Sequence, residues 1–412
     1  MSSPDSVLAE FRPGLTAYVQ GGIAEPLDLR DILQAAPEAL TDVRLIGGLI
    51  PGINTFDYTA LNERARQTVF MMNPAFRAGF DAGRVTLRPL PYSQTVHAFI
   101  HDAPPDLAIV QVAPPDEEGR CSLGPCTDFA PLIWGRAKRR IAFINPNYPA
   151  TRRGPSVALA SIDVAVETDH PYITGEDGPV NAEQAAIADH IARLIPDGAA
   201  LQSGIGGAPA AALARLANRK GLRIRSGLLT QGYRDLYEAG ALAADAEHIT
   251  GMAYGSVAFT RWAAETISFA DSTVTHGAAG LAATDGLHAI NSALEVDLFG
   301  QANIEWRGGK AVSGLGGAPD FAGAARRSKG GRAILALAAT AGGGKISRIV
   351  ARLEAPTVSI PRNDTDLVIT EHGVADLRGT SLDQRAEALI AVAAPAFRAE
   401  LAAAWEATRR AM

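Results

Sequence analysis

The sequence predicts an α/β protein of two similar-sized domains, each built on an open parallel sheet. Its 412 residues are too many for one ordinary core and suit two domains of roughly 200 residues. Short apolar runs such as 106–112 (DLAIVQV) and 140–144 (RIAFI) are typical of strands buried on both faces of a parallel sheet. Glycines and helical patterns follow the strand candidates, and this alternation indicates βα units.

The first half supplies the elements of one such domain. The expected strands cover 15–20, 42–46, 106–112 and 140–144, and 27–36 has a helical pattern. The stretch 166–180 (VETDHPYITGEDGPV) is polar and rich in turn residues, so it predicts a linker. We therefore expect an N-terminal domain over 1–175 and a C-terminal domain over 176–412 that carries the glycine loops.

The second half opens like the first. Asn181 is expected to cap a helix over 182–194, and later helices are expected over 209–217 and 231–239. Strands are expected over 199–202 and 222–225, the second ending at Gly227. When one half is laid on the other, Gln20 and its two glycines match the turn at Gln202, and Gly48 matches Gly227. This match predicts two copies of one βα plan.

Composition excludes several classes of function. The formal net charge is −6 without a run of basic residues, so a nucleic-acid partner is not expected. No apolar run approaches the ~20 residues of a membrane helix, and residues 1–12 lack the pattern of a signal peptide. The only cysteines, Cys121 and Cys126, cannot complete a zinc site and indicate a reducing compartment. We expect a cytoplasmic protein without a bound metal.

Two nearly identical glycine loops occur in the second half. Residues 203–209 (SGIGGAP) and 313–319 (SGLGGAP) differ only by Ile205 for Leu315, and a helical pattern begins at each proline. Glycines let a backbone approach a ligand, and helix N-termini favour negative charge. A single loop of this kind would be read as a tight turn without a ligand, but the repetition favours ligand contact.

Several strings resemble the acetyl-CoA hydrolase/transferase family, which includes 4-hydroxybutyrate, butyrate and succinate:acetate CoA-transferases. In chain order they are PPDEEGRCSLG (114–124), LQSGIGG (201–207), INSALEVDLFGQ (290–301), SKGG (328–331), ISRIV (346–350) and TEHGVADLRG (370–379). The resemblance runs from about residue 104 to residue 397.

The resemblance implies two domains of the CoA-transferase fold with the active site in the cleft between them. It also implies a glutamate that attacks an acyl-CoA thioester and passes CoA to a small carboxylate, through a mixed anhydride and a glutamyl thioester. Coenzyme A is then part of the substrate and no separate cofactor is expected. The residues expected to bind it are Gln202, Gly204, Gly206, Gly207, Gly314, Gly317, Gly343, Gly344 and Lys345.

Three positions depart from the family pattern. Aligned from Gln202, the Thr-Glu pair that carries the nucleophile falls on Ser226 and Gly227, and no Asp or Glu lies between Gln202 and Arg234. An oxyanion-binding Asn falls on His276, and a frequent Lys falls on Gly342. The second oxyanion donor of the family, the N–H of Gly316, is retained.

Two side chains are the candidates for catalysis at this altered site. His276 could act as a general base, could donate a hydrogen bond to an oxyanion, or could be an ordinary loop histidine. Glu295 could polarise a water, or it could pair with an arginine or cap a turn. Asp297 and Cys121 are interpreted as structural, and His372 has a weaker claim.

These residues lead to a hypothesis of hydrolysis. Gly227 would leave open the space of the glutamate, a water would enter, and His276 or Glu295 would activate it against a thioester held by Gly206, Gly207 and Gly316. The alternatives are transfer by a relocated carboxylate, a catalytically silent CoA-binding protein and an inactive subunit of a hetero-oligomer. Sugar-phosphate isomerases share a related fold only by analogy. A homodimer is expected as the commonest assembly.

Overall fold

The computed structural model describes residues 3–176 and 178–412, so Asp177 of the predicted linker lies outside the described residues. The chain forms two compact units. Unit 1 contains the residues up to Glu176 together with Ile249–Thr275 and Val312–Gly316, and unit 2 contains the rest. The boundary at 175/176 stays a prediction, and no pattern in the sequence indicated that the two later segments belong to unit 1.

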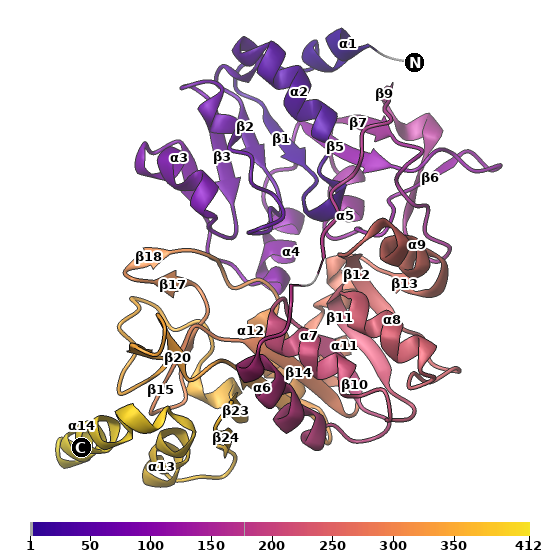
Figure 1. Ribbon diagram of the computed structural model, residues 1–412. Coiled ribbons are helices and arrows are strands. Elements are labelled where there is room, and N and C mark those ends of the chain that lie inside the picture. The colour runs from indigo at the N-terminus through magenta and orange to yellow at the C-terminus, as the bar shows by residue number, and fades with distance from the viewer. Residues whose placement is uncertain (1–2, 177) are drawn as a thin grey trace. The chain divides into compact units, whose positions relative to one another are not determined.

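Unit 1 is built on a seven-stranded parallel sheet in the order β4-β3-β2-β1-β5-β7-β9 (Figure 1). These strands are β1 (Thr16–Val19), β2 (Arg44–Ile46), β3 (Arg66–Val69), β4 (Val85–Leu87), β5 (Leu107–Val112), β7 (Arg139–Ile144) and β9 (Val164–Glu167). The short strands β6 (Arg120–Ser122) and β8 (Ser156–Ala158) pair antiparallel, and β12 (Ile249–Ala253) and β13 (Ser268–Phe269) pair in parallel. The helices are α1 (Pro4–Leu8), α2 (Leu27–Ala35), α3 (Arg77–Asp81), α4 (Tyr92–His101), α5 (Ala130–Trp134), α9 (Val257–Thr266) and α10 (Ser272–Thr275).

The sheet of unit 1 is covered on both faces. Alternate residues of β5 enter two different apolar clusters, Leu107 with Leu29 of α2 on one face and Ala108 with Phe99 of α4 on the other. Every residue of β5 is buried. The prediction of a strand buried on both faces is therefore confirmed.

Unit 2 contains six strands of the second, eight-stranded sheet, in the order β11-β10-β14-β19-β23-β24, with only the edge pair antiparallel. They are β10 (Ala200–Ser203), β11 (Arg223–Leu229), β14 (Leu287–Ser292), β19 (Arg332–Ala336), β23 (Leu367–Thr370) and β24 (Gly373–Asp376). Small sheets are formed by β15 (Glu295–Asp297), β16 (Ala302–Asn303) and β22 (Ile349–Val350), by β17 (Trp306–Arg307) and β18 (Lys310–Ala311), and by β20 (Thr340–Ala341) and β21 (Ile346–Ser347).

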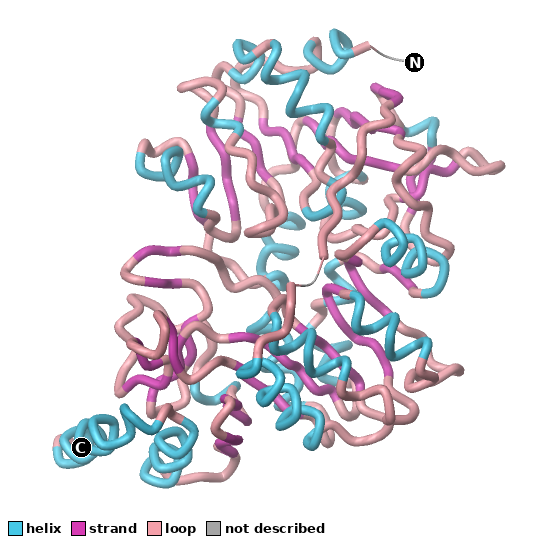
Figure 2. The backbone as a smooth tube through the Cα atoms, in the orientation of Figure 1, coloured by secondary structure: helices cyan, strands magenta, loops and turns pink. Residues whose placement is uncertain are grey.

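Helices alternate with these strands along the chain, as Figure 2 shows. In unit 2 they are α6 (Ala182–Leu194), α7 (Gly207–Ala214), α8 (Gln231–Glu238), α11 (Ala278–Ala282), α12 (Ala318–Arg327), α13 (Leu382–Val392) and α14 (Arg398–Arg410). Single 3₁₀ turns occur at Gly22–Ala24, Pro37–Leu40, Tyr58–Ala60, Pro74–Phe76, Leu159–Ser161, Arg362–Asp364 and Pro395–Phe397. Within the described residues, no helix combines the length and the apolar character that a membrane crossing requires.

Most expected elements are found within a few residues, and two boundaries differ. Asn181 caps α6 as predicted, in a reciprocal capping box with Gln184. Gly227 was expected to end a strand, but β11 continues to Leu229, so Gly227 lies inside it. The helix expected from Pro209 already begins at Gly207.

The two units repeat one plan. The strand orders β2-β1-β5-β7-β9 and β11-β10-β14-β19-β23 correspond, and all neighbours in both runs are parallel. Gln20 directly follows β1, and its Oε1 accepts a hydrogen bond from the N–H of Gln111 in β5 at 3.2 Å. In unit 2, Gln202 lies within β10, the counterpart of β1, and its side chain bonds to Asn291 of β14, the counterpart of β5. The internal match seen in the sequence reflects this repeated sheet.

Candidate active site

The first glycine loop leaves β10 where the strand order of unit 2 reverses. β10 has β11 on one side and β14 on the other. Ligands of open α/β sheets bind beyond the carboxyl ends of the strands at such a point. The side chains of Gln202 and Asn291 are buried there and bond reciprocally, Gln202 Nε2 to Asn291 Oδ1 at 3.1 Å and Asn291 Nδ2 to Gln202 Oε1 at 3.0 Å. This amide pair fixes the two strands relative to each other.

The glycines of the first loop are closely packed against polar side chains. A Cβ at Gly204 would lie 2.8 Å from Asn291 Oδ1, and a Cβ at Gly206 would lie 2.7 Å from Ser292 Oγ. Gly206 also has a φ of +142°, a conformation that favours glycine. Larger residues would displace side chains from β14 or its end. The glycines are therefore required by packing within unit 2, whether or not a ligand approaches them.

Gly227 in β11 contacts the imidazole of His276, which directly follows α10. A Cβ at position 227 would lie 2.7 Å from both Cε1 and Nε2 of His276. This is well inside the ~3.5 Å of a favourable contact between non-bonded atoms. The expectation of open space beside Gly227 is wrong, because the His276 ring fills the place where a side chain would begin.

A second glycine touches the same ring. A Cβ at Gly317, the residue before α12, would overlap Nε2 of His276. Phe321 of α12 lies edge-on to the imidazole, with ring centroids 5.1 Å apart. The sequence analysis did not single out Phe321, since a phenylalanine on the buried face of a helix gives no signal beyond packing.

The environment of His276 makes its imidazole a weak base. The residue is 4% exposed, and burial lowers its pKa from 6.5 to about 3. Burial disfavours the charged form because the charge loses its hydration. The ring is therefore neutral near pH 7, with one nitrogen that donates a hydrogen bond and one that accepts.

The chain is similar to known proteins of one family. Residues 255–405 match the family model of the acetyl-CoA hydrolase/transferase C-terminal domain. Over 390 residues the chain is 32% identical to 4-hydroxybutyrate coenzyme A transferase of Clostridium kluyveri, and the match covers 92% of this chain and 91% of that protein. The chain belongs to the acetyl-CoA hydrolase/transferase family.

Solved structures agree with this family assignment. RipA of Yersinia pestis matches with a TM-score of 0.92 and 28% identity, over 99% of this chain and 97% of that one. 4-Hydroxybutyrate CoA-transferase of Porphyromonas gingivalis matches with a TM-score of 0.82 and 28% identity, over 100% and 97%. The predicted fold class is confirmed. The family acts on CoA thioesters, and its relatives are named both as CoA-transferases and as acetyl-CoA hydrolases.

The second glycine loop of this family member begins in unit 1. A Cβ at Gly314 would lie 2.7 Å from Cγ and 2.8 Å from Cα of Met71. The N–H of Met72 donates to the carbonyl of Ser313 at 3.0 Å, and the N–H of Tyr92 donates to the carbonyl of Gly316 at 2.9 Å. Gly316 has a φ of +53°. These contacts fix the loop, and the role of the Gly316 amide as an oxyanion donor stays a prediction.

Glu295 belongs to a different group of contacts. Its Oε2 accepts a hydrogen bond from Asn303 Nδ2 at 3.1 Å, across the pair β15 and β16. It also interacts electrostatically with Arg348, whose pKa is lowered by burial and by Arg307 while Glu295 and Glu371 oppose that change. Asp297 accepts hydrogen bonds from the N–H groups of Phe299 and Gln301, at 3.0 and 2.9 Å, which is a turn-forming role.

The remaining predicted residues lie at turns. Gly342, Gly343, Gly344 and Lys345 form the exposed tip between β20 and β21, and the three glycines have φ values of +60°, +66° and +87°. Glu371 and His372 form the turn between the antiparallel strands β23 and β24, and Glu371 Oε2 accepts a hydrogen bond from the N–H of Ala339 at 2.8 Å. The backbone conformation at the tip between β20 and β21 favours glycine, with or without a bound ligand.

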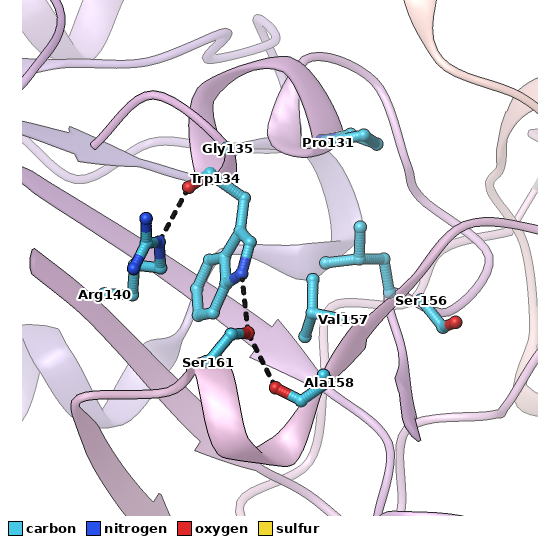
Figure 3. A pocket seen from close by; sticks show the side chains of 9 residues that line it. Pro131, Trp134, Gly135, Arg140, Ser156, Val157, Ala158 and Ser161 are labelled. Atoms are coloured by element: carbon cyan, nitrogen blue, oxygen red, sulfur yellow. Dashed lines mark hydrogen bonds between the residues drawn. The ribbon is translucent and has the colours of Figure 1, made fainter. Parts of the chain in front are cut away.

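A pocket of about 360 Å³ lies in unit 1 (Figure 3). Three of its polar side chains donate hydrogen bonds within the lining: Trp134 Nε1 to Ser161 Oγ at 3.1 Å, Ser161 Oγ to the carbonyl of Ala158 at 2.6 Å, and Arg140 Nε to the carbonyl of Trp134 at 2.9 Å. These hydrogen bonds hold together the residues that form the wall of the pocket. None of the candidate site residues lines this pocket.

Cys121 and Cys126 are both buried and free, and Cys121 packs in the apolar cluster with Phe129, which fits the packing role expected for it. Among the residues that the structure describes, no group of three or more His, Cys, Asp and Glu side chains is arranged to hold a metal ion.

Proposed function

We propose that this chain acts on acyl-CoA thioesters and hydrolyses them with an activated water, without a covalent enzyme intermediate. The observation that carries the proposal is the contact between Gly227 and the His276 imidazole. By resemblance to the family, position 227 is that of the nucleophilic glutamate. Glycine has no group that can form a thioester, and a ring already occupies the adjoining space.

In this proposal His276 donates a hydrogen bond to the thioester oxyanion, and the amide of Gly316 is the second donor. A pKa of about 3 makes His276 a poor general base at neutral pH, because catalytic bases work best with a pKa near the working pH. A neutral imidazole N–H still stabilises developing negative charge. The donor role, one of the two expected from the sequence, is therefore preferred over the base.

Glu295 is the carboxylate we assign to polarising the water, with Asn303 holding one of its oxygens. The loops with Gln202, Gly204, Gly206 and Gly207, and with Gly314 and Gly317, are proposed to bind the CoA moiety. Lys345, exposed beside Gly343 and Gly344, is suited to the phosphates of CoA because its ammonium can reach solvent. A homodimer remains the expected assembly, which sedimentation would test.

The same contact also favours a second candidate, a catalytically silent CoA-binding protein or an inactive subunit of a hetero-oligomer. A buried, neutral ring in the place of the nucleophile blocks covalent transfer and supplies a weak base. Free thiol released from acetyl-CoA and longer acyl-CoAs, with and without acetate, separates the readings. Release without acceptor supports hydrolysis, acceptor-dependent exchange supports transfer by another carboxylate, and CoA binding without either supports the silent protein.

The assignment of position 227 as the place of the nucleophile can be tested by introducing a glutamate there. Gly227→Glu alone is expected to be inactive and destabilised, because its Cβ meets His276 at 2.7 Å. Gly227→Glu with His276→Asn removes that conflict and should give acetate-dependent CoA exchange and a glutamyl-CoA adduct in intact-mass spectra. His276→Asn alone is the matched control and should form no adduct. A folded double variant without an adduct would contradict the assignment of position 227.

A further inference from the structure

Asp128 in unit 1 is a buried acid bonded to helix α10. Its Oδ1 accepts a hydrogen bond from Ser272 Oγ at 3.0 Å, and its carbonyl accepts one from the N–H of Ser272 at 2.9 Å. Ser272 is the first residue of α10, which ends at Thr275. The next residue in the chain is His276.

The carboxyl of Asp128 is surrounded by backbone and by groups that are neutral at pH 7. A Cβ at Gly48 would lie 2.9 Å from its Oδ2, so this oxygen faces backbone. The titratable groups that act on it or feel its charge are the phenols of Tyr18 and Tyr92 and the thiol of Cys126, and burial raises the pKa of all three. Among the described residues, no cation contributes to the shift of Asp128, whose pKa burial raises to about 7 against the lowering effect of Ser272.

The backbone of Asp128 is also in an unfavourable conformation. Its φ is +39°, in the left-handed region that residues other than glycine seldom adopt. A buried acid and a strained backbone at one residue are both destabilising, and such features persist where the surrounding structure requires them. The geometry thus marks Asp128 as more than a packing residue.

The residues beside Asp128 hold the same returning segment, Ile249–Thr275. The N–H of Thr127 donates to Gly251 O at 2.9 Å and its Oγ1 donates to Ala270 O at 2.7 Å. The N–H of Ala253 donates to Pro125 O at 2.9 Å. Strand β12 and Ala270, the residue after β13, are thereby tied to the loop that contains Asp128, and Ser272 is bonded to Asp128 itself.

We propose that Asp128 is a positioning residue for His276, acting through Ser272 and helix α10. The proposal rests on the proposed function, in which His276 touches the substrate. Asp128 itself touches no reacting atom. Its carboxyl fixes the first residue of the four-residue helix α10. Because His276 directly follows this helix, loss of that hydrogen bond changes the position of His276.

The protonation state of Asp128 gives the proposal a signature. The folded pKa lies above the unfolded value of 3.8, so the stabilisation from the proton is complete below pH 3.8 and is lost as pH rises through about 7. Above that pH the carboxylate is charged in an apolar site and the loop is weakened. His276, with a pKa of about 3, and the neutral phenols and thiol do not titrate in this range.

The test compares four variants of the full chain between about pH 6 and about pH 9. Asp128→Asn keeps an oxygen for Ser272 and removes ionisation, Asp128→Ala removes both, and Ser272→Ala removes the donor. Asp271→Asn is the matched control, because Asp271 caps the same helix from a more exposed position by accepting the N–H of Thr273 at 2.8 Å. Thioester turnover and hydrogen exchange of the amides of 272–276 are measured.

The expected result is a fall of kcat above pH 7 in the wild-type chain that is absent in Asp128→Asn and present in Asp271→Asn. Ser272→Ala should lower kcat about tenfold with little change in KM. If even the wild-type chain shows no turnover, the proposed function fails, and exchange at 272–276 still tests Asp128. Exchange that rises with pH equally in the wild-type chain and Asp128→Asn, or is unchanged in Ser272→Ala, would overturn the proposal.

Discussion

The two glycine loops have almost the same sequence and different structures. In the first, Gly206 has a φ of +142° and α7 begins at Gly207. In the second, the corresponding Gly316 has a φ of +53° and α12 begins one position later, at Ala318. The first loop packs against side chains of unit 2, whereas the second packs against Met71 of unit 1 up to Gly316 and against His276 of unit 2 at Gly317.

The difference shows that a glycine motif indicates where only small residues fit. The motif does not indicate which neighbouring atoms exclude a larger side chain. At Gly207 the neighbour is the flexible side-chain amide of Gln184, and at Gly317 it is a buried ring. At Gly204 it is one side-chain oxygen, and at Gly314 it includes backbone atoms. Backbone and buried rings cannot move aside, so equal substitutions should have unequal effects.

The largest contrast is expected between Gly317→Ala and Gly207→Ala. Gly317→Ala forces a Cβ onto Nε2 of His276 and should lower the free energy of unfolding by about 3 kcal/mol. Gly207→Ala displaces only Gln184 and should cost less than about 1 kcal/mol. Denaturant unfolding measures both. Adding His276→Ala to Gly317→Ala should recover part of the loss, and equal costs for the two single variants would break the comparison.

A smaller contrast is expected one step earlier in each loop. Gly314→Ala places a Cβ 2.8 Å from Met71 Cα and Phe70 O, so the backbone must shift, at about 2 kcal/mol. Gly204→Ala meets Asn291 Oδ1 at 2.8 Å and should cost about 1 kcal/mol, the value of one displaced amide hydrogen bond. Thermal unfolding of the two variants side by side checks the order. A larger loss for Gly204→Ala would show that the amide pair matters more than the backbone contact.

The last contrast concerns acid stability, because the second loop packs against the buried imidazole of His276. The pKa of His276 is lowered in the folded state to about 3, so the unfolded chain binds one more proton between there and pH 6.5. Stability should therefore fall by about 1.4 kcal/mol per pH unit as pH drops below 6.5. His276→Asn removes this part of the slope, and His101→Asn, at an exposed position, should leave it unchanged. Parallel slopes in all three proteins would contradict the burial of His276.

The site was only partly predictable. The resemblance to the family, aligned from Gln202, predicts that Gly227 and His276 depart from the family pattern, and the structure places these two residues against each other. Their spatial relation had no signal in the sequence, because 49 positions separate them and contact depends on how α10 leads into unit 2. The prediction of open space at Gly227 is wrong for the same reason. The lack of a side chain leaves space only if no neighbouring side chain fills it.

The sequence by itself determined the α/β class, the strands β1, β2, β5, β7, β10 and β11, the repeated plan and the two glycine loops, since these follow from the local spacing of apolar residues, glycines and caps. Only the tertiary structure showed that 249–275 and 312–316 belong to unit 1 and that a neutral imidazole lies between Gly227 and Gly317. The same holds for the hydrogen bond that the Asp128 carboxyl accepts from Ser272. Those facts depend on burial and on contacts between distant segments, which local pattern does not encode.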